Sequence, residues 1–137
     1  MIRRAMSSDI PALITLRGAV RENRLSDPSR VTRADIEWFI AHGPVHVWLG
    51  QDGILGFSAS DPRDGSIWAL FVDPAHEGCG IGQALLKAAC DSAAAAGHTV
   101  LRLSTDPGTR AARFYARNGW MEQGMTAQGE VAFTKAL

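Results

Sequence analysis

The sequence predicts an α+β fold, with a mixed, mostly antiparallel central sheet that contains one parallel strand pair and is flanked by about four helices. Three observations lead to this prediction. A length of 137 residues, 46% of them hydrophobic, suits a single domain over residues 1–137 with its own core. Apolar residues recur at helical spacing in some segments and at strand spacing in others. A helix also separates two later strands, a connection that places neighbouring strands parallel.

The first half of the chain holds helix and hairpin signals. Pro11 suits the first turn of a helix that should run to about Asn23. Thr32 begins a capping box that ends at Asp35 and opens a second helix. Asp52-Gly53 predicts a tight hairpin between two strands. The strands expected in this half cover residues 2–5, 45–49, 54–60 and 66–72.

The second half begins where Asp73-Pro74 ends the third closely spaced strand. A glycine-rich loop follows, and a long helix then runs to Gly97. The remaining expected elements are a strand over 100–103, a helix over 109–118 and two tail strands around 128–129. The exposed sheet edge that these tail strands would form is compatible with a homodimer.

Composition excludes several functional classes. Lysine and arginine number 14 and so do aspartate and glutamate, whereas a nucleic-acid-binding protein normally carries a basic excess. Apolar stretches are too short to span a membrane, and no apolar segment of a secretory signal follows the basic N-terminus. The two cysteines form neither a disulfide framework nor a metal-binding pattern. We therefore expect a cytoplasmic protein without metal, membrane or nucleic-acid partners.

The most informative segment is the glycine-rich start of the long helix. Gly78, Gly80 and Gly82 lack a Cβ atom, so their amides can approach a ligand closely. A helix start has unpaired N–H groups and the positive end of the helix dipole, and no capping side chain stands immediately at this one. A diphosphate would satisfy these amides. The alternative to a ligand site is a glycine-rich connecting loop whose amides bind water.

Two common phosphate motifs fit this segment poorly. A P-loop requires Gly-Lys-Ser/Thr, whereas this chain has Gly82-Gln83-Ala84. A dinucleotide fingerprint has its last glycine replaced by Gln83 or Leu85, depending on where it starts. A dinucleotide-dependent oxidoreductase therefore remains a weak alternative.

The same segment resembles motif A of the Gcn5-related N-acetyltransferase (GNAT) family, Arg/Gln-x-x-Gly-x-Gly/Ala. Gly80 and Gly82 match its glycines, and Leu85-Leu86 follows as the helix continues. The segment from Ala111 to Trp120 is similar to a second family signature, A-x-x-F-Y-x-x-x-G-F/W. The predicted order of elements also resembles the GNAT fold from the first strand to the last.

This resemblance implies an enzyme that moves an acetyl group from acetyl-CoA, or another acyl group from its CoA ester, to a primary amine of a small molecule. Transfer would be direct, in a ternary complex. Main-chain amides would hold the pyrophosphate, and a strand would pair with the pantetheine arm and stabilise the oxyanion. The residues implied for the pyrophosphate are Glu77, Gly78, Cys79, Gly80, Ile81, Gly82 and Gln83, and those for the arm are Leu70, Phe71 and Val72.

The resemblance also suggests catalytic residues. Tyr115, the only tyrosine, matches the residue that protonates the departing thiolate; a core aromatic is the alternative. Glu22 is the best carboxylate for the general base, ahead of His46 and Glu37.

Two residues depart from the family pattern. Glu77 stands where arginine or glutamine is usual, and Gly108 stands where an asparagine often contacts the cofactor. These departures keep a non-catalytic acyl-CoA sensor as an alternative. Arg110, Arg113 and Arg117 follow helical spacing, and we expect either a solvated basic face or a contact with the ribose phosphate, with Phe114 and Tyr115 pointing elsewhere.

Overall fold

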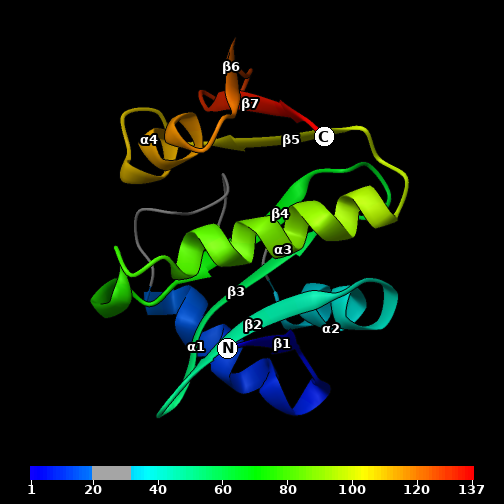
Figure 1. The fold of residues 1–137 in the computed structure, drawn as a ribbon, viewed down its shortest axis with the longest axis vertical. Coiled ribbons are helices and arrows are strands. Elements are labelled where there is room, and N and C mark those ends of the chain that lie inside the picture. The colour runs from blue at the N-terminus through cyan, green and yellow to red at the C-terminus, as the bar shows by residue number, and fades with distance from the viewer. Residues whose placement is uncertain (20–31) are drawn as a thin grey trace.

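A computed structural model describes residues 1–19 and 32–137 of the chain, and this part contains two sheets and four α-helices (Figure 1). The α+β class and the expected number of helices are thereby confirmed for the described residues. The strands are β1 (Ile2–Arg4), β2 (Val45–Gly50), β3 (Gly53–Ser60), β4 (Ile67–Val72), β5 (Val100–Thr105), β6 (Met121–Met125) and β7 (Val131–Ala136). The helices are α1 (Ile10–Ala19), α2 (Arg33–His42), α3 (Ile81–Ala95) and α4 (Arg110–Arg117), with short 3-10 turns η1 (Ser7–Asp9) and η3 (Pro74–His76).

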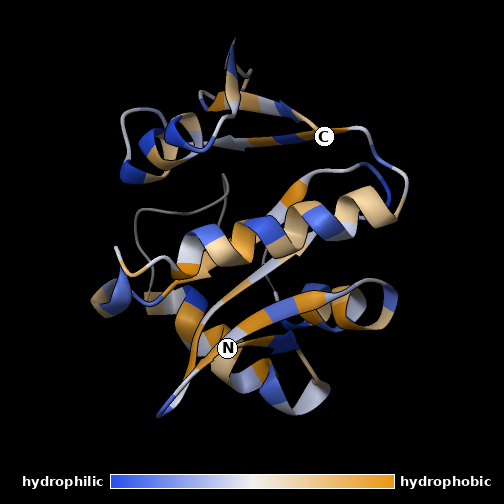
Figure 2. Ribbon diagram, viewed as in Figure 1, coloured by the Kyte–Doolittle hydropathy of each residue, from blue (hydrophilic) through white to orange (hydrophobic). Residues whose placement is uncertain are grey.

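The first sheet is an antiparallel meander in the order β1-β2-β3-β4. Alternate residues of its strands face opposite layers, as the strand period requires. Phe57 packs in a core shared with α1 and α2, whereas the hydroxyl of its neighbour Ser58 donates to the Leu85 carbonyl of α3 at 2.8 Å. Hydrophobic and hydrophilic residues alternate around α3, as expected of a helix with one buried side (Figure 2).

A glycine in β3 lets α3 approach the sheet closely. A Cβ atom on Gly56 would lie 2.7 Å from Leu85 Cδ1 and 2.8 Å from the Phe71 carbonyl oxygen. Both distances are far below ordinary contact, so only glycine fits between helix and strand here. This close packing fixes the position of α3 over β3 and β4.

The second sheet has the order β5-β7-β6, also antiparallel, and confirms the two tail strands. Leu101 and Leu103 of β5 and Phe133 of β7 point into a core that they share with α3 and α4. This common core joins the second sheet to the first.

The predicted parallel strand pair is not formed, because every ladder in both sheets is antiparallel. Between β4 and β5 only one isolated parallel bridge exists, between Ser66 and Arg102. A parallel ladder requires strands about 4.8 Å apart. Beyond the bridge the two strands diverge (Figure 1), and side chains of α4 face β4 across a cleft.

Several local predictions hold in the described residues. Thr32 Oγ1 accepts the Asp35 amide and the Asp35 carboxylate accepts the Thr32 amide, each at 3.2 Å, which completes the capping box. The β2–β3 hairpin turns at residues 51–52. The expected continuation of the first helix to Asn23 lies outside the described residues. None of the helices described is both long and apolar enough to cross a bilayer.

Candidate functional site

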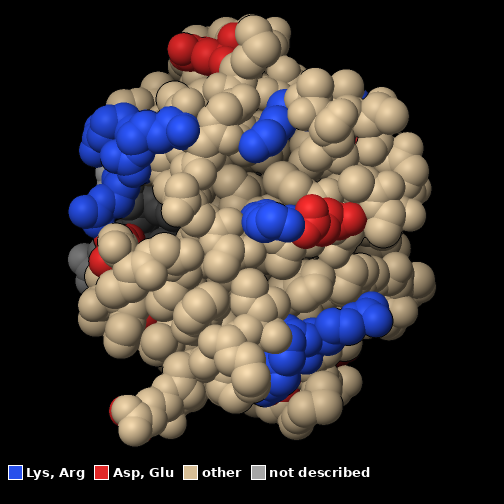
Figure 3. All heavy atoms as spheres, in the orientation of Figure 1, with Lys and Arg blue, Asp and Glu red and all other residues tan. Residues whose placement is uncertain are grey.

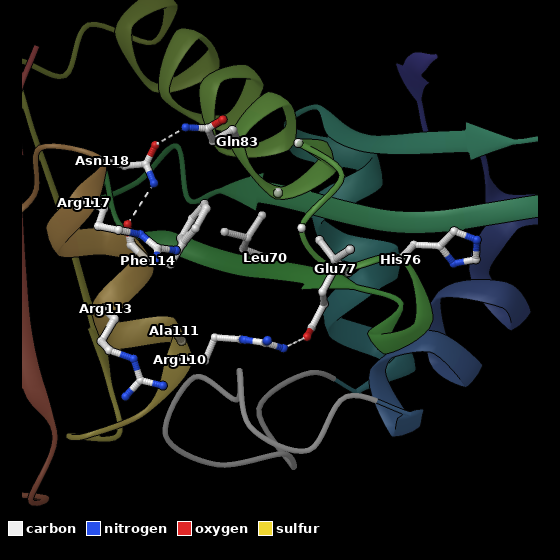
Figure 4. A pocket seen from close by; sticks show the side chains of 14 residues that line it. Leu70, His76, Glu77, Gln83, Arg110, Ala111, Arg113, Phe114, Arg117 and Asn118 are labelled. Carbon is white, nitrogen blue, oxygen red and sulfur yellow. Dashed lines mark hydrogen bonds and ion pairs between the residues drawn. The ribbon is translucent and has the colours of Figure 1, made fainter.

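A cleft of about 700 Å³ lies between the C-terminal half of β4, the start of α3 and one side of α4 (Figure 4). Leu70 and Val72 form its wall on β4. The loop after η3 and the first turn of α3 form a second wall. Helix α4 closes the third side, with Phe114 facing inward. The cleft therefore opens where the two sheets diverge.

The start of α3 presents bare main-chain amides to this cleft. Gly80 is the N-cap residue, with a left-handed φ of 82°, and among the described residues no side chain caps the helix. Gly78 has the same φ of 82°, which glycine adopts without strain. A Cβ atom on Gly80 would meet no atom of residues 1–19 or 32–137 within 4 Å. The first amides of a helix have no intrahelical acceptor, so this open entrance is suited to an anion.

The inner part of the cleft is narrow, and hydrogen bonds connect the two helices that border it. A Cβ atom on Gly82 would lie 3.6 Å from Phe114 and 3.7 Å from Val72, so a larger side chain would fill the space between them. Gln83 Nε2 donates to Asn118 Oδ1 at 3.0 Å, and Asn118 Nδ2 donates to the Phe114 carbonyl at 2.8 Å. These two hydrogen bonds connect α3 with α4 behind the cleft (Figure 4).

The acidic residue at the cleft is held by an arginine. Glu77 forms an ion pair with Arg110 across the cleft mouth, from the α3 loop to the first turn of α4 (Figure 4). The negative charge that departs from the family pattern is therefore matched by a positive charge from another element. Arg113 Nη1 donates to the Gly108 carbonyl at 3.2 Å, and Gly108 itself takes a left-handed φ of 71°.

The structure brings most of the predicted cofactor residues to one place. Those that line the cleft are Leu70, Val72, Glu77, Gly78, Gly80, Gly82 and Gln83. Phe71 points the other way, stacked on Phe57 at 5.2 Å, because side chains alternate along a strand. Ile81 is buried in the core, and the exposed Cys79 does not line the cleft. Main-chain contacts of these residues with a cofactor stay a prediction.

Tyr115 lies in the core rather than on the cleft wall. Its ring is fully buried, 5.8 Å from the Trp120 ring and 6.0 Å from the Phe133 ring. Its hydroxyl has no hydrogen-bond partner in the part of the chain that is described. Burial raises the pKa of the phenol well above its usual value, so the group keeps its proton at neutral pH.

Of the candidate bases, the two that lie in the described residues do not line the cleft. Glu22 lies outside the described residues. Glu37 is exposed on α2 and pairs with Arg33 at 3.1 Å. His46 is on β2, where burial lowers its pKa, and it does not line the cleft.

Sequence reasoning missed or misplaced several cleft residues. His76 and Asn118 line the cleft, and no spacing rule singled them out. Phe114 was expected to point away from the arginines, yet it shares the cleft with them. Adjacent helix residues are about 100° apart, so Phe114 can face the cleft while Tyr115 faces the core. In residues 1–19 and 32–137, no group of His, Cys, Asp or Glu side chains could hold a metal ion.

The fold is that of an α+β protein with two sheets, in which a helix with a glycine N-cap begins beside the edge strand β4 at a cleft. The sequence model of the acetyltransferase (GNAT) family matches residues 13–120. The chain belongs to this family and is an acetyltransferase by class. This result confirms the resemblance seen in the two motifs and disfavours the oxidoreductase alternative.

Solved structures share the fold along the whole chain. A GCN5-related N-acetyltransferase from Rhodopseudomonas palustris is 18% identical with a TM-score of 0.80, covering 100% of this chain and 95% of its own. PaiA N-acetyltransferase from Thermoplasma acidophilum, solved with coenzyme A, is 16% identical with a TM-score of 0.80, covering 100% and 98%. YncA from Salmonella typhimurium, solved with acetyl-CoA, is 22% identical with a TM-score of 0.74, covering 100% and 93%. No curated protein matches the sequence.

Proposed function

We propose that this chain transfers an acetyl group from acetyl-CoA, or an acyl group from a related CoA ester, to a primary amine of a small molecule. Transfer is direct, within a ternary complex. The observation that carries the proposal is the uncapped start of α3, whose amides open into a cleft beside β4. The family to which the chain belongs supports the same chemistry, and two structures of similar fold were solved with CoA or acetyl-CoA.

The residues at the cleft fit the phosphate end of this cosubstrate. The amides from Ile81 to Gln83 are the first of the helix, and the N-cap glycine has no side chain to accept their hydrogen bonds, so a diphosphate can accept them instead. The positive end of the helix dipole adds attraction for the same charge. Glu77 does not oppose this binding, because Arg110 compensates its charge.

The edge of β4 fits the elongated arm of the cosubstrate. The Asp73 amide donates to the Leu55 carbonyl at 2.7 Å, which directs it toward β3. Successive amides of a strand face opposite edges, so the Val72 amide faces away from β3. Val72 also lines the cleft, which lets an extended amide chain pair there as an additional strand.

In the reaction, the neutral amine attacks the thioester carbonyl, the carbon–sulfur bond breaks and the thiolate takes a proton. A donor on the β4 edge would stabilise the oxyanion. Tyr115 is our candidate for the proton donor because it matches the tyrosine of the family signature, and this role requires that its buried hydroxyl reach the thiolate from the core. Glu22 is our candidate for the base that takes the proton of the amine.

The decisive experiment measures thiol release from acetyl-CoA with a panel of primary amines, including aminoglycosides, amino acids and polyamines. We expect release that depends on both acetyl-CoA and one amine class, with a matching mass increase of the amine. When both substrate concentrations are varied, the double-reciprocal plots should give intersecting lines, as a ternary complex requires, and not parallel lines.

The alternative, a non-catalytic acyl-CoA sensor, predicts binding of acetyl-CoA without turnover on any amine. Gly80→Asp serves as the negative control, because this variant should lose both the binding of acetyl-CoA and the release of thiol. A chain that does not bind acetyl-CoA at all would contradict the enzyme and the sensor together.

A further inference from the structure

Helix α4 brings an excess of positive charge to the edge of the cleft. Arg110, Arg113 and Arg117 all line it, and Glu77 is the only acidic residue among the described lining residues. Lys and Arg side chains gather over α4 on the molecular surface (Figure 3). The basic stripe seen in the sequence is therefore part of the cleft wall, and not only a solvated face.

The three arginines differ in how they are paired. Arg110 forms the ion pair with Glu77. Arg113 donates to a main-chain carbonyl, that of Gly108, which leaves its charge uncompensated. Arg117 has no ion pair or hydrogen bond within the described part of the chain. Two cationic side chains, Arg113 and Arg117, therefore lie four residues apart without an acidic partner among the described residues.

Such an arrangement is unfavourable for the helix alone. Like charges four residues apart on a helix repel one another. The uncapped start of α3 forms a second, separate positive region on the opposite wall of the same cleft. A ligand with two separate phosphate groups would satisfy both regions at once.

We propose that Arg113 and Arg117 form a subsite for a phosphate monoester, distinct from the diphosphate site at α3. This inference rests on the proposed function, under which the ligand is a CoA ester. CoA carries a monoester on its ribose, whereas 3′-dephospho-CoA carries only the diphosphate. The subsite therefore makes the chain bind CoA more tightly than 3′-dephospho-CoA. Arg110 is not part of the subsite, because the ion pair with Glu77 compensates its charge.

The test measures the Kd of CoA and of 3′-dephospho-CoA by calorimetry. A charge-assisted contact to phosphate is strong enough that the wild-type chain should bind CoA at least about tenfold more tightly. In the double variant Arg113→Gln with Arg117→Gln, the ratio of the two Kd values should fall toward one. The Kd of 3′-dephospho-CoA itself should change less than about threefold.

A matched control removes two positive charges elsewhere. Arg33 on α2 and Arg102 on β5 are exposed and do not line the cleft, so Arg33→Gln with Arg102→Gln changes the net charge equally. This control should keep the wild-type ratio, which excludes a general effect of net charge.

Two results would overturn the subsite. One is a wild-type ratio near one, and the other is a ratio that the Arg113 and Arg117 changes leave as it was. If the wild-type chain bound neither ligand, the proposed function would fail as well. Binding of both ligands with equal affinity would refute the subsite alone, since 3′-dephospho-CoA retains the diphosphate.

Discussion

Tyr115 has a buried phenol whose hydroxyl lacks a hydrogen-bond partner in the described part of the chain. Removing this hydroxyl therefore tests its role in the reaction without breaking a hydrogen bond among the described residues. Tyr115→Phe keeps the ring and removes only the hydroxyl. If the hydroxyl donates a proton to the thiolate, kcat should fall at least about 100-fold. The melting temperature should stay equal or rise slightly, because an unpaired buried polar group is removed. Steady-state kinetics and thermal unfolding check both parts.

A core variant provides the comparison for Tyr115. Phe133→Leu alters the packing around the same ring, so it should lower the melting temperature and leave kcat largely intact at permissive temperatures. An unchanged kcat in Tyr115→Phe would assign the residue to the core alone.

At the scale of one element, the start of α3 carries the proposed diphosphate site. Gly80→Asp places a carboxylate where the cleft is open and where φ is 82°. The new charge repels a diphosphate and the side chain occupies its place, so CoA affinity should fall more than about 100-fold. Calorimetric titration with CoA measures this loss.

The other end of the same helix offers a matched control. Gly97 also has a left-handed φ, 97°, and a Cβ there would meet none of the described residues within 4 Å. Gly97→Asp therefore adds the same strain and charge away from the cleft, and CoA affinity should be unchanged. Aspartate is favourable at a helix N-terminus and unfavourable at a C-terminus, so the control should be the less stable variant. Retained affinity in Gly80→Asp would remove the diphosphate from this position.

The elements also differ in how far the sequence predicts them. The α3 entrance was predictable because its cause is local: Gly78, Gly80 and the lack of a capping side chain are all read within a few residues. The parallel pair was wrong because strand pairing depends on what fills the space between strands. Beyond the Ser66–Arg102 bridge that space is a cleft.

The direction of the side chains on α4 could not be predicted from the sequence either. Motif similarity identified the Phe114-Tyr115 pair, but not which of the two faces the cleft. That choice depends on Trp120 and Phe133, which lie on later segments and enclose Tyr115. The ion pair of Glu77 with Arg110 could not be predicted either, because the two residues lie 33 positions apart along the chain.

Across the whole molecule, the cleft lies between two sheets that touch through one parallel bridge and a shared core. A ligand that contacts the start of α3, the edge of β4 and the arginines of α4 would connect both sides. Binding of this kind is possible only in the folded chain, so it must raise the free energy of unfolding.

CoA should therefore stabilise the protein against heat, whereas NADH and NADPH should not. At a concentration 100 times its Kd, a ligand adds about 2.7 kcal/mol, which corresponds to a rise in melting temperature of about 5–15 °C. Hydrogen exchange should locate this effect: amides of β4, the first turn of α3 and α4 should be slowed, and those of β1 and α2 should change little below global unfolding. Because β4 belongs to the first sheet and α4 packs against the second, protection of both by one ligand is the signature of binding between the two sheets. Stabilisation by NADPH and not by CoA, or protection confined to one sheet, would contradict a CoA site in this cleft.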